Sequence, residues 1–316
     1  MEIVFLDAAT IGDVPNLDEI KKLGEYTSYE NTMPEESIHR LRNADIVIVN
    51  KVLINKEVMD ACPNLKLVCV SATGMNNVDL EYAGKKGIEV KNVAGYSTNS
   101  VAQVTFSLIL EILVRTHYYN DYIQSGKYSS SSLFTHFGPS FWELNEKQMG
   151  IIGLGAIGGK VADIAGAFGA KICYHSTSGK NMDRPYKHLS LEELLQTSDI
   201  VSIHAPLNDQ TLNLIDLPQL QLMKRSALLI NVGRGGIVNE TALAKAIDEG
   251  MIAGAGSDVF TREPLPEDHP FLKVKKKENL LLLPHIAWAS LEARSLLVSR
   301  IAGNIKKYMA DHPDLN

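Results

Sequence analysis

The sequence has few cysteines: Cys62, Cys69 and Cys173 are the only three among 316 residues. An odd number with this wide spacing fits neither a disulfide framework nor a metal-binding motif. Cys69 and Cys173 also fall within apolar runs, where a thiol is usually buried. We therefore expect free thiols, a reducing compartment and no bound metal.

The sequence also lacks an excess of positive charge and a long apolar run. Its formal net charge is -6, and the basic run at residues 273–277 is interrupted by Val274. Nucleic acid and anionic membranes are therefore not expected as partners. The longest apolar helix candidate, residues 101–114, contains Gln103 and Glu111 and is too short to span a bilayer. We expect a cytoplasmic protein that binds small molecules.

Internal repeats and low-complexity tracts are absent, and the length suggests two domains. Strand-like apolar runs alternate with helical patterns through residues 2–90 and again through 149–283, which predicts α/β architecture with two doubly wound parallel sheets. A single long helix is expected at residues 100–118, and an irregular polar and aromatic segment at 128–142. Because the first unit is complete, the last helix, residues 291–309, is expected to return to it. The predicted domains are residues 1–99 plus 286–316, and residues 100–285.

The most informative stretch begins at residue 149. An apolar strand is followed by Gly153-Leu154-Gly155-Ala156-Ile157-Gly158, a helical pattern and a second apolar strand at 171–174. In this context G-x-G-x-x-G predicts a dinucleotide site, because the glycines permit a tight turn, close approach of a pyrophosphate and close helix packing. The alternative is a glycine-rich turn without a ligand.

An acidic residue is missing where the second strand of this motif ends. Folds specific for NAD usually carry Asp or Glu there to bind the ribose hydroxyls. Here the strand is followed by Ser176, Thr177, Ser178, Gly179 and Lys180. Hydroxyls and a lysine could instead bind a 2′-phosphate, so NADP is slightly favoured over NAD. The alternative is a solvated loop with NAD bound through other contacts.

Several candidate site residues follow predicted strands, where ligands bind in open α/β sheets. Thr73, Gly74 and Met75 could offer amides to a small anion, although a plain loop is an equal alternative. Arg234, set among glycines, could bind a carboxylate through two hydrogen bonds from its guanidinium. The alternative is a surface Arg in a turn.

Two further residues could act as an acid/base pair. His285 follows the apolar strand at 280–283, and Glu263 precedes Pro264. A carboxylate beside an imidazole fixes its tautomer and favours its protonated form. Taken singly, His285 could equally be structural and Glu263 a solvated acid.

The sequence resembles the D-isomer-specific 2-hydroxyacid dehydrogenase family. The resemblance rests on four spaced motifs, GLGAIG at 153–158, NVGRG at 231–235, DVFTREP at 258–264 and PHIAW at 284–288. Segments 72–79 and 92–103 resemble the glycerate dehydrogenase and hydroxypyruvate reductase branch. The resemblance implies two Rossmann-like domains, the first a flavodoxin-like substrate domain, with the active site in the cleft between them, and a homodimer.

The resemblance also implies roles for residues. Arg234 would hold the substrate carboxylate and carbonyl, His285 would exchange a proton with the carbonyl oxygen, and Glu263 would keep His285 protonated. Substrate contacts would come from Thr73, Gly74, Met75, Arg234 and Trp288. Cofactor contacts would come from Gly153, Leu154, Gly155, Ala156, Ile157, Gly158, Ser176, Thr177, Ser178, Lys180, His204, Ala205, Pro206, Val232, Gly233, Asp258 and His285.

The expected activity is interconversion of a small 2-oxo acid and its D-2-hydroxy acid with NAD(P)(H). Trp288, with Phe141 or Trp142, would restrict the pocket to a substrate such as hydroxypyruvate or glyoxylate. Two alternatives remain open. One is a D-lactate-type dehydrogenase, and the other is an NAD(H)-sensing protein similar to the family's transcriptional corepressors.

Overall fold

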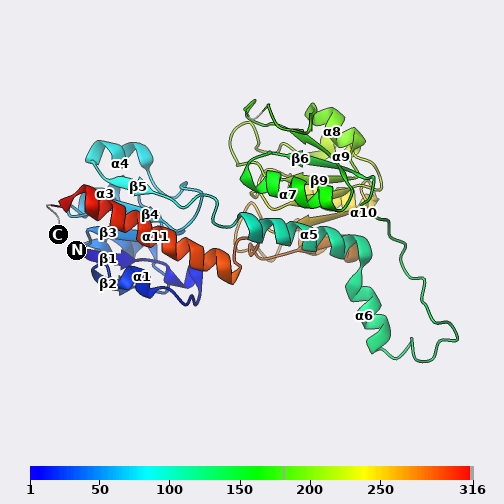
Figure 1. Ribbon diagram of the computed structural model, residues 1–316, viewed down its shortest axis with the longest axis horizontal. Helices are drawn as coiled ribbons and strands as arrows, with labels where there is room; N and C mark the ends of the chain where they lie inside the picture. Colours follow the sequence, from blue (N-terminus) through cyan, green and yellow to red (C-terminus); the bar gives the residue numbers. More distant parts are fainter. Residues whose placement is uncertain (181, 314–316) are drawn as a thin grey trace. The chain divides into compact units, whose positions relative to one another are not determined.

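The computed structural model describes residues 1–180 and 182–313. The chain divides into two compact units, Met1–Ser97 with Ala289–Asn316, and Thr98–Trp288 (Figure 1). The predicted boundaries, after residues 99 and 285, lie two and three residues from these limits. Among the described residues, no helix combines the length and apolar character needed to cross a membrane.

The first unit is a five-stranded parallel sheet with the order β2-β1-β3-β4-β5. Its strands are β1 Glu2–Phe5, β2 Glu25–Ser28, β3 Ile46–Val49, β4 Leu67–Val70 and β5 Glu89–Lys91. Its helices are η1 Ala8–Ile11, α1 Asp18–Lys21, η2 Pro34–Glu36, α2 Ser37–Leu41, α3 Lys56–Ala61, α4 Leu80–Lys86 and α11 Leu291–Asp311. The last helix, α11, packs against α1 and β4, so the chain does return to this unit (Figure 1).

The second unit is a seven-stranded parallel sheet with the order β12-β11-β10-β9-β6-β7-β8. Its strands are β6 Gln148–Ile152, β7 Lys171–His175, β8 Lys187–His188, β9 Ile200–Ile203, β10 Leu228–Asn231, β11 Gly254–Ser257 and β12 Leu280–Leu282. Its helices are α5 Thr98–Val114, α6 Thr116–Gln124, α7 Ala156–Ala167, α8 Leu191–Thr197, α9 Leu217–Leu222, α10 Glu240–Glu249, η3 Pro270–Lys273 and η4 Lys277–Asn279.

Each face of this second sheet has its own core, because successive side chains of a strand point to opposite faces. In β6, Ile151 joins the cluster under α5 and α7, whereas Ile152 joins the cluster under α8, α9 and α10. Both faces are covered, and this explains why the central strands of the unit read as continuous apolar runs. The two predicted doubly wound parallel sheets are thereby confirmed.

The predicted single helix at residues 100–118 is wrong. It is two helices, α5 and α6, separated at Arg115, whose φ is +57°. Arg115 Nη2 donates to Asn279 Oδ1 at 2.6 Å, and the Glu111 carboxylate accepts the His117 amide at 3.2 Å and the Thr116 hydroxyl. Glu111 therefore supplies the acceptor that the first turn of α6 needs, and the helix restarts.

Candidate functional site

The turn between β6 and α7 brings the two central strands of the second sheet into contact. Gly153 has φ +91°, and a Cβ there would lie 2.8 Å from the Ala205 amide nitrogen. A Cβ at Gly158 would lie 2.2 Å from the Gly153 carbonyl oxygen. Only glycine fits these contacts, so the predicted turn sits directly against the His204-Ala205 segment that follows β9.

The start of α7 is open and uncapped. Gly155 is its N-cap residue, no acidic residue occupies the first turn, and a Cβ at Gly155 would meet no atom within 4 Å. In the described part of the chain, the amides of Leu154, Gly155, Ala156 and Ile157 donate to no protein acceptor. Free amides and the positive end of a helix dipole form an anion site.

His204 lies beside this turn and carries an unused nitrogen. Its Nε2 is 2.9 Å from Ser202 Oγ, while Nδ1 is buried without a hydrogen-bond partner in the described residues. Burial lowers the pKa of His204 to about 3, so the ring is neutral at neutral pH. A neutral imidazole with a free buried nitrogen can still bond to a ligand group.

The segment after β7 is folded on itself. Ser176 Oγ donates to the Lys180 carbonyl at 2.5 Å, and the Lys180 amide donates to Ser178 Oγ at 3.3 Å. Ser178 and Lys180 are exposed, and Ser176 and Thr177 are half-buried. The loop thus places three hydroxyls and a lysine at the end of the strand where the acid is missing.

The loop after β10 presents Arg234 to solvent on an ordered backbone. Asn231 is buried, its Oδ1 accepts the Gly233 amide and its Nδ2 donates to the Arg234 carbonyl, both at 3.1 Å. Arg234 Nη1 donates to the Gly233 carbonyl at 2.8 Å, and no carboxylate of the described residues pairs with this guanidinium. Sequence reasoning gave Asn231 no role, although its place in the NVGRG motif was a usable signal.

Close packing joins the Arg234 loop to the segment that carries Glu263. A Cβ at Gly235 would lie 2.0 Å from both the carbonyl carbon and oxygen of Phe260. Glu263 then turns back, because its Oε1 accepts the Phe260 amide at 3.0 Å. The backbone beside Arg234 and the backbone that orients Glu263 are therefore in direct contact.

Glu263 and His285 form the predicted pair. Glu263 Oε2 lies 2.7 Å from His285 Nδ1, and the two side chains are 30% and 26% exposed. Since the carboxylate accepts, Nδ1 carries the proton. In the described part of the chain Nε2 has no partner. The structure brings the two residues together in the arrangement that general acid/base chemistry needs.

Asp258 holds His285 in an unusual backbone conformation. His285 has φ +56°, in the left-handed region that non-glycine residues rarely adopt. The buried Asp258 carboxylate accepts the next two amides, from Ile286 at 2.8 Å and Ala287 at 2.9 Å. Burial raises the pKa of Asp258, and these two amides oppose that rise. The role of Asp258 toward the cofactor stays a prediction, and in the structure its two oxygens also fix the loop that carries His285.

The other predicted substrate contacts have different surroundings. Thr73, Gly74 and Met75 belong to the first unit, after β4, and their amides donate to no acceptor among the described residues. Asn92 Nδ2 fixes this segment by donating to the Thr73 carbonyl at 2.6 Å. Trp288 is half-buried and packs against the core beneath α5 and α7.

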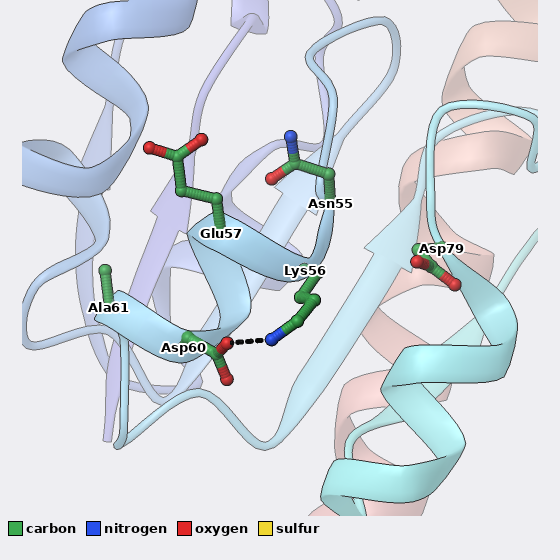
Figure 2. Close-up of a pocket in the computed structure, with 6 residues that line it drawn as sticks. All are labelled: Asn55, Lys56, Glu57, Asp60, Ala61 and Asp79. Carbon is green, nitrogen blue, oxygen red and sulfur yellow. Dashed lines mark hydrogen bonds and ion pairs between the residues drawn. The ribbon is translucent and has the colours of Figure 1, made fainter.

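A surface hollow between α3 and α4 of the first unit is not part of this site. Figure 2 shows the Lys56 side chain directed at Asp60 one turn further along α3, with their charged atoms 2.7 Å apart. Asp60 also accepts from Tyr82 and Lys86, at 2.6 and 3.1 Å. Lys56, Tyr82 and Lys86 hold the pKa of Asp60 below its usual range. These charges pair with one another and link the two helices.

Comparison with known proteins decides the family. Residues 106–287 match the model of the NAD-binding domain of D-isomer-specific 2-hydroxyacid dehydrogenases. The chain belongs to this family. It is 36% identical to a glycerate dehydrogenase of Methylorubrum extorquens, with 99% of this chain and 97% of the relative covered. It is 35% identical to a hydroxypyruvate reductase of Blautia hydrogenotrophica, with 99% and 98% covered.

Solved structures of family members agree with the fold. The D-lactate dehydrogenase of Aquifex aeolicus, in complex with NAD and lactic acid, has a TM-score of 0.85 at 28% identity, with 99% of this chain and 96% of that chain covered. An NADPH-dependent glyoxylate/hydroxypyruvate reductase of Sinorhizobium meliloti, in complex with NADP and malonate, has a TM-score of 0.82 at 28% identity, with 98% and 93% covered. The protein is thus an oxidoreductase of a family whose members act on 2-hydroxy acids with NAD(P).

The residues at the β6–α7 turn fit the nicotinamide dinucleotide that the family uses. The free amides at the start of α7 and the open space at Gly155 suit a pyrophosphate, and the orphaned His204 nitrogen offers a further polar contact. No acidic residue of the first helical turn opposes the phosphate charge.

Proposed function

We propose that the protein interconverts a small 2-oxo acid and its D-2-hydroxy acid, with His285 as the acid/base. The observation that carries the proposal is the 2.7 Å pairing of Glu263 Oε2 with His285 Nδ1, which leaves Nε2 as the proton-exchanging atom. The nicotinamide, when bound, supplies or accepts the hydride. His285 gives a proton to the carbonyl oxygen in reduction and takes it back in oxidation.

Arg234 and Glu263 have separate tasks in this proposal. The guanidinium of Arg234, which pairs with no carboxylate of the described residues, binds the substrate carboxylate and polarises the carbonyl, because its geometry matches two oxygens at once. Glu263 stabilises the protonated ring and fixes its tautomer. In the first unit, the amides of Thr73, Gly74 and Met75 have no acceptor among the described residues and are proposed as an anion contact.

Hydroxypyruvate and glyoxylate are the favoured substrates. The support is the similarity to relatives named glycerate dehydrogenase and hydroxypyruvate reductase, and to a glyoxylate reductase of Korarchaeum cryptofilum that is 37% identical. Trp288 is proposed to limit the pocket to small side chains. The likeness to a D-lactate dehydrogenase keeps pyruvate as the second candidate. A clear preference for phenylpyruvate over hydroxypyruvate would reject the small pocket.

NADP(H) is the proposed cofactor, slightly ahead of NAD(H). No carboxylate stands at the end of β7, and the exposed Lys180 with its neighbouring hydroxyls suits a 2′-phosphate. The solved reductase in complex with NADP supports the same choice by likeness.

A homodimer is proposed because one part of the second unit exposes large apolar side chains. Between α6 and β6, Phe134 is 90% exposed and Phe137 is 88% exposed. Neighbouring apolar side chains of this size are rarely left in water, and a second copy of the chain would cover them. Light scattering of the wild type and of a Phe134→Ser, Phe137→Ser variant tests this proposal. A monomeric wild type would reject it.

The deciding experiment follows oxidation of NADPH and of NADH with hydroxypyruvate, glyoxylate, pyruvate and 2-oxoisocaproate. His285→Gln should lose most turnover yet bind cofactor, and Arg234→Ala should mainly weaken substrate binding and transition-state placement. Turnover that survives in His285→Gln would refute the acid/base assignment. Cofactor binding by the wild type without any turnover would favour the corepressor-like sensor.

A further inference from the structure

The second unit contains another histidine–glutamate pair, His269 with Glu240. His269 is 5% exposed, the Glu240 side chain is 13% exposed, and their Nε2 and Oε2 atoms are 2.9 Å apart. The ring of His269 packs edge-on against Phe260 and Phe271, with centroid distances of 6.0 and 4.9 Å, and these two rings also contact each other. Burying a carboxylate is costly unless all of its bonds are made, so the surroundings of Glu240 are informative.

The tautomer of His269 follows from its neighbours. The Phe271 amide donates to His269 Nδ1 at 3.2 Å, so Nδ1 is the acceptor and Nε2 carries the proton. That proton is donated to Glu240. The other carboxylate oxygen of Glu240, Oε1, accepts the Thr261 amide at 2.7 Å. The chain of bonds therefore runs from η3, through His269 and Glu240, to the backbone at Thr261.

Thr261 is next to the residue that orients Glu263. The Phe260 amide donates to Glu263 Oε1, and Phe260 also packs on Gly235 beside Arg234. Glu240 is the first residue of α10, directly after the Arg234 loop and its N-cap Asn239. The buried pair thus fixes the same short backbone segment that sets the positions of Glu263 and, through it, His285.

We propose that Glu240 and His269 are positioning residues for the Glu263–His285 pair, a role that rests on the function proposed above. Neither residue is assigned contact with substrate or cofactor. Loss of their bonds would release the Thr261 amide and let Glu263 shift. Because proton transfer needs hydrogen-bond geometry, a displacement near 1 Å should lower turnover about ten- to hundred-fold.

The test uses the full-length protein with hydroxypyruvate as substrate. His269→Phe keeps ring volume among Phe260 and Phe271 but removes both hydrogen bonds. It should lower kcat about ten- to hundred-fold, while the Kd of NADPH, from fluorescence titration, changes by less than about twofold. His269→Gln can still donate to Glu240 and should retain at least about a third of the wild-type kcat. Phe271→Leu is the matched control, since it alters packing on His269 but keeps the backbone donor.

Three outcomes would overturn the proposal. These are a wild-type kcat in His269→Phe, an equal loss of kcat in Phe271→Leu at equal loss of Tm, and no recovery in His269→Gln. If His269→Phe does not fold, Glu240→Gln takes its place. Glu240→Gln keeps an oxygen for the Thr261 amide but turns an amide N–H toward His269. A lower kcat with unchanged NADPH affinity is again expected. An unchanged kcat would refute the positioning role. His285→Gln separates the failures, because its full activity would reject the acid/base assignment itself.

Discussion

Both sheets reverse their strand order between two central strands, and the two points of reversal are chemically opposite. In the second unit the reversal lies between β6 and β9, where Gly153 contacts Ala205 and the amides of the following turn are free. In the first unit it lies between β1 and β3, where the buried Asp7 carboxylate accepts the amides of Asn50, Lys51 and Val52.

The sheet topology determines where a crevice forms, and the side chains determine its charge and which amides remain unpaired. Parallel sheets of this kind place a crevice at the reversal point, and ligands bind there in many folds. Asp7 fills that position in the first unit with a negative charge and satisfies the local amides. Among the described residues of the second unit, the amides of the turn after β6 have no acceptor, and the first turn of α7 contains no acid. Two similar sheets therefore present opposite electrostatic surroundings at the same topological position because of single residues.

We call the reversal point between β6 and β9, with its unpaired amides, the open one, and the point between β1 and β3, which Asp7 occupies, the closed one. The largest expected effect comes from placing an acid at the open reversal point. Gly155 has φ -82° and ψ -157°, which any residue adopts, and its Cβ position is empty. Gly155→Asp should therefore fold normally and gain about 0.5–1 kcal/mol as an N-cap. Its charge should weaken NADPH binding at least about 100-fold, roughly 2.7 kcal/mol. Fluorescence titration and thermal unfolding measure the two effects.

Gly155→Ser is the control for this change, since it adds a neutral cap of similar size. It should lose less affinity than Gly155→Asp, and the gap between the two variants reports the charge. Wild-type affinity in Gly155→Asp would mean that the pyrophosphate does not approach this turn.

The reverse experiment removes the acceptor in the first unit. Asp7→Asn keeps the shape of the side chain but points an NH₂ group or a weaker oxygen at three amides. Loss of charge-assisted hydrogen bonds in a buried position should cost about 2–3 kcal/mol. Amide exchange at residues 50–52 should accelerate accordingly, while the NADPH affinity of the second unit stays unchanged. Asp18→Asn, at an exposed side chain, is the control, and equal exchange in both variants would contradict the closed arrangement.

Local sequence signals made the reversal point of the second unit predictable, whereas the closure of the reversal point in the first unit could not be predicted. The glycines, the strand and the helix of the cofactor turn are contiguous, so each level of the sequence indicates the same structure. The partners of Asp7 begin 43 residues later, and a single acid after a strand has no pattern that predicts them. The Glu240–His269 pair spans 29 residues and was missed for the same reason.

The polar edge strands and the break between α5 and α6 were also missed, because no local sequence pattern marks them. The outermost strands β2 and β8 are made of polar, largely exposed residues, so no apolar run marks them. The break after α5 depends on a bond from Arg115 to Asn279, 164 residues away. In contrast, Arg234 and His285 directly follow apolar strands, and Glu263 precedes Pro264, so local features of the sequence made all three visible. Their mutual geometry needed the fold.

A smaller effect is expected at the end of β7, the strand next to β6. Ser176→Asp would restore a carboxylate at the end of β7, where it can bind ribose hydroxyls and repel a 2′-phosphate. The ratio of kcat/KM for NADPH to that for NADH should fall about tenfold, close to 1.4 kcal/mol. Ser176→Asn, which adds a neutral side chain of the same shape, is the control and should lower the ratio less than Ser176→Asp does. An unchanged ratio in Ser176→Asp would place the ribose away from this strand.

The smallest expected effect uses the buried histidine of the open reversal point. His204 is neutral in the folded protein, and burial lowers its pKa from 6.5 to about 3. Below pH 6.5 His204 binds a proton in the unfolded chain but stays neutral in the folded chain. The contribution of His204 is therefore fully retained above pH 6.5 and is lost progressively toward pH 3.

His204→Gln has no such titration and can keep a hydrogen bond to Ser202. The difference in unfolding free energy between wild type and variant should therefore move by about 1 kcal/mol in favour of the variant between pH 6.5 and 5.5. Urea unfolding of both proteins at several pH values measures this difference. Burial raises the pKa of Asp7, which gives an opposite pH dependence, but Asp7 is present in both proteins and its contribution cancels in the difference. Parallel pH curves would show that the His204 ring is already solvated, and its free nitrogen would then be satisfied by water rather than held ready for a cofactor.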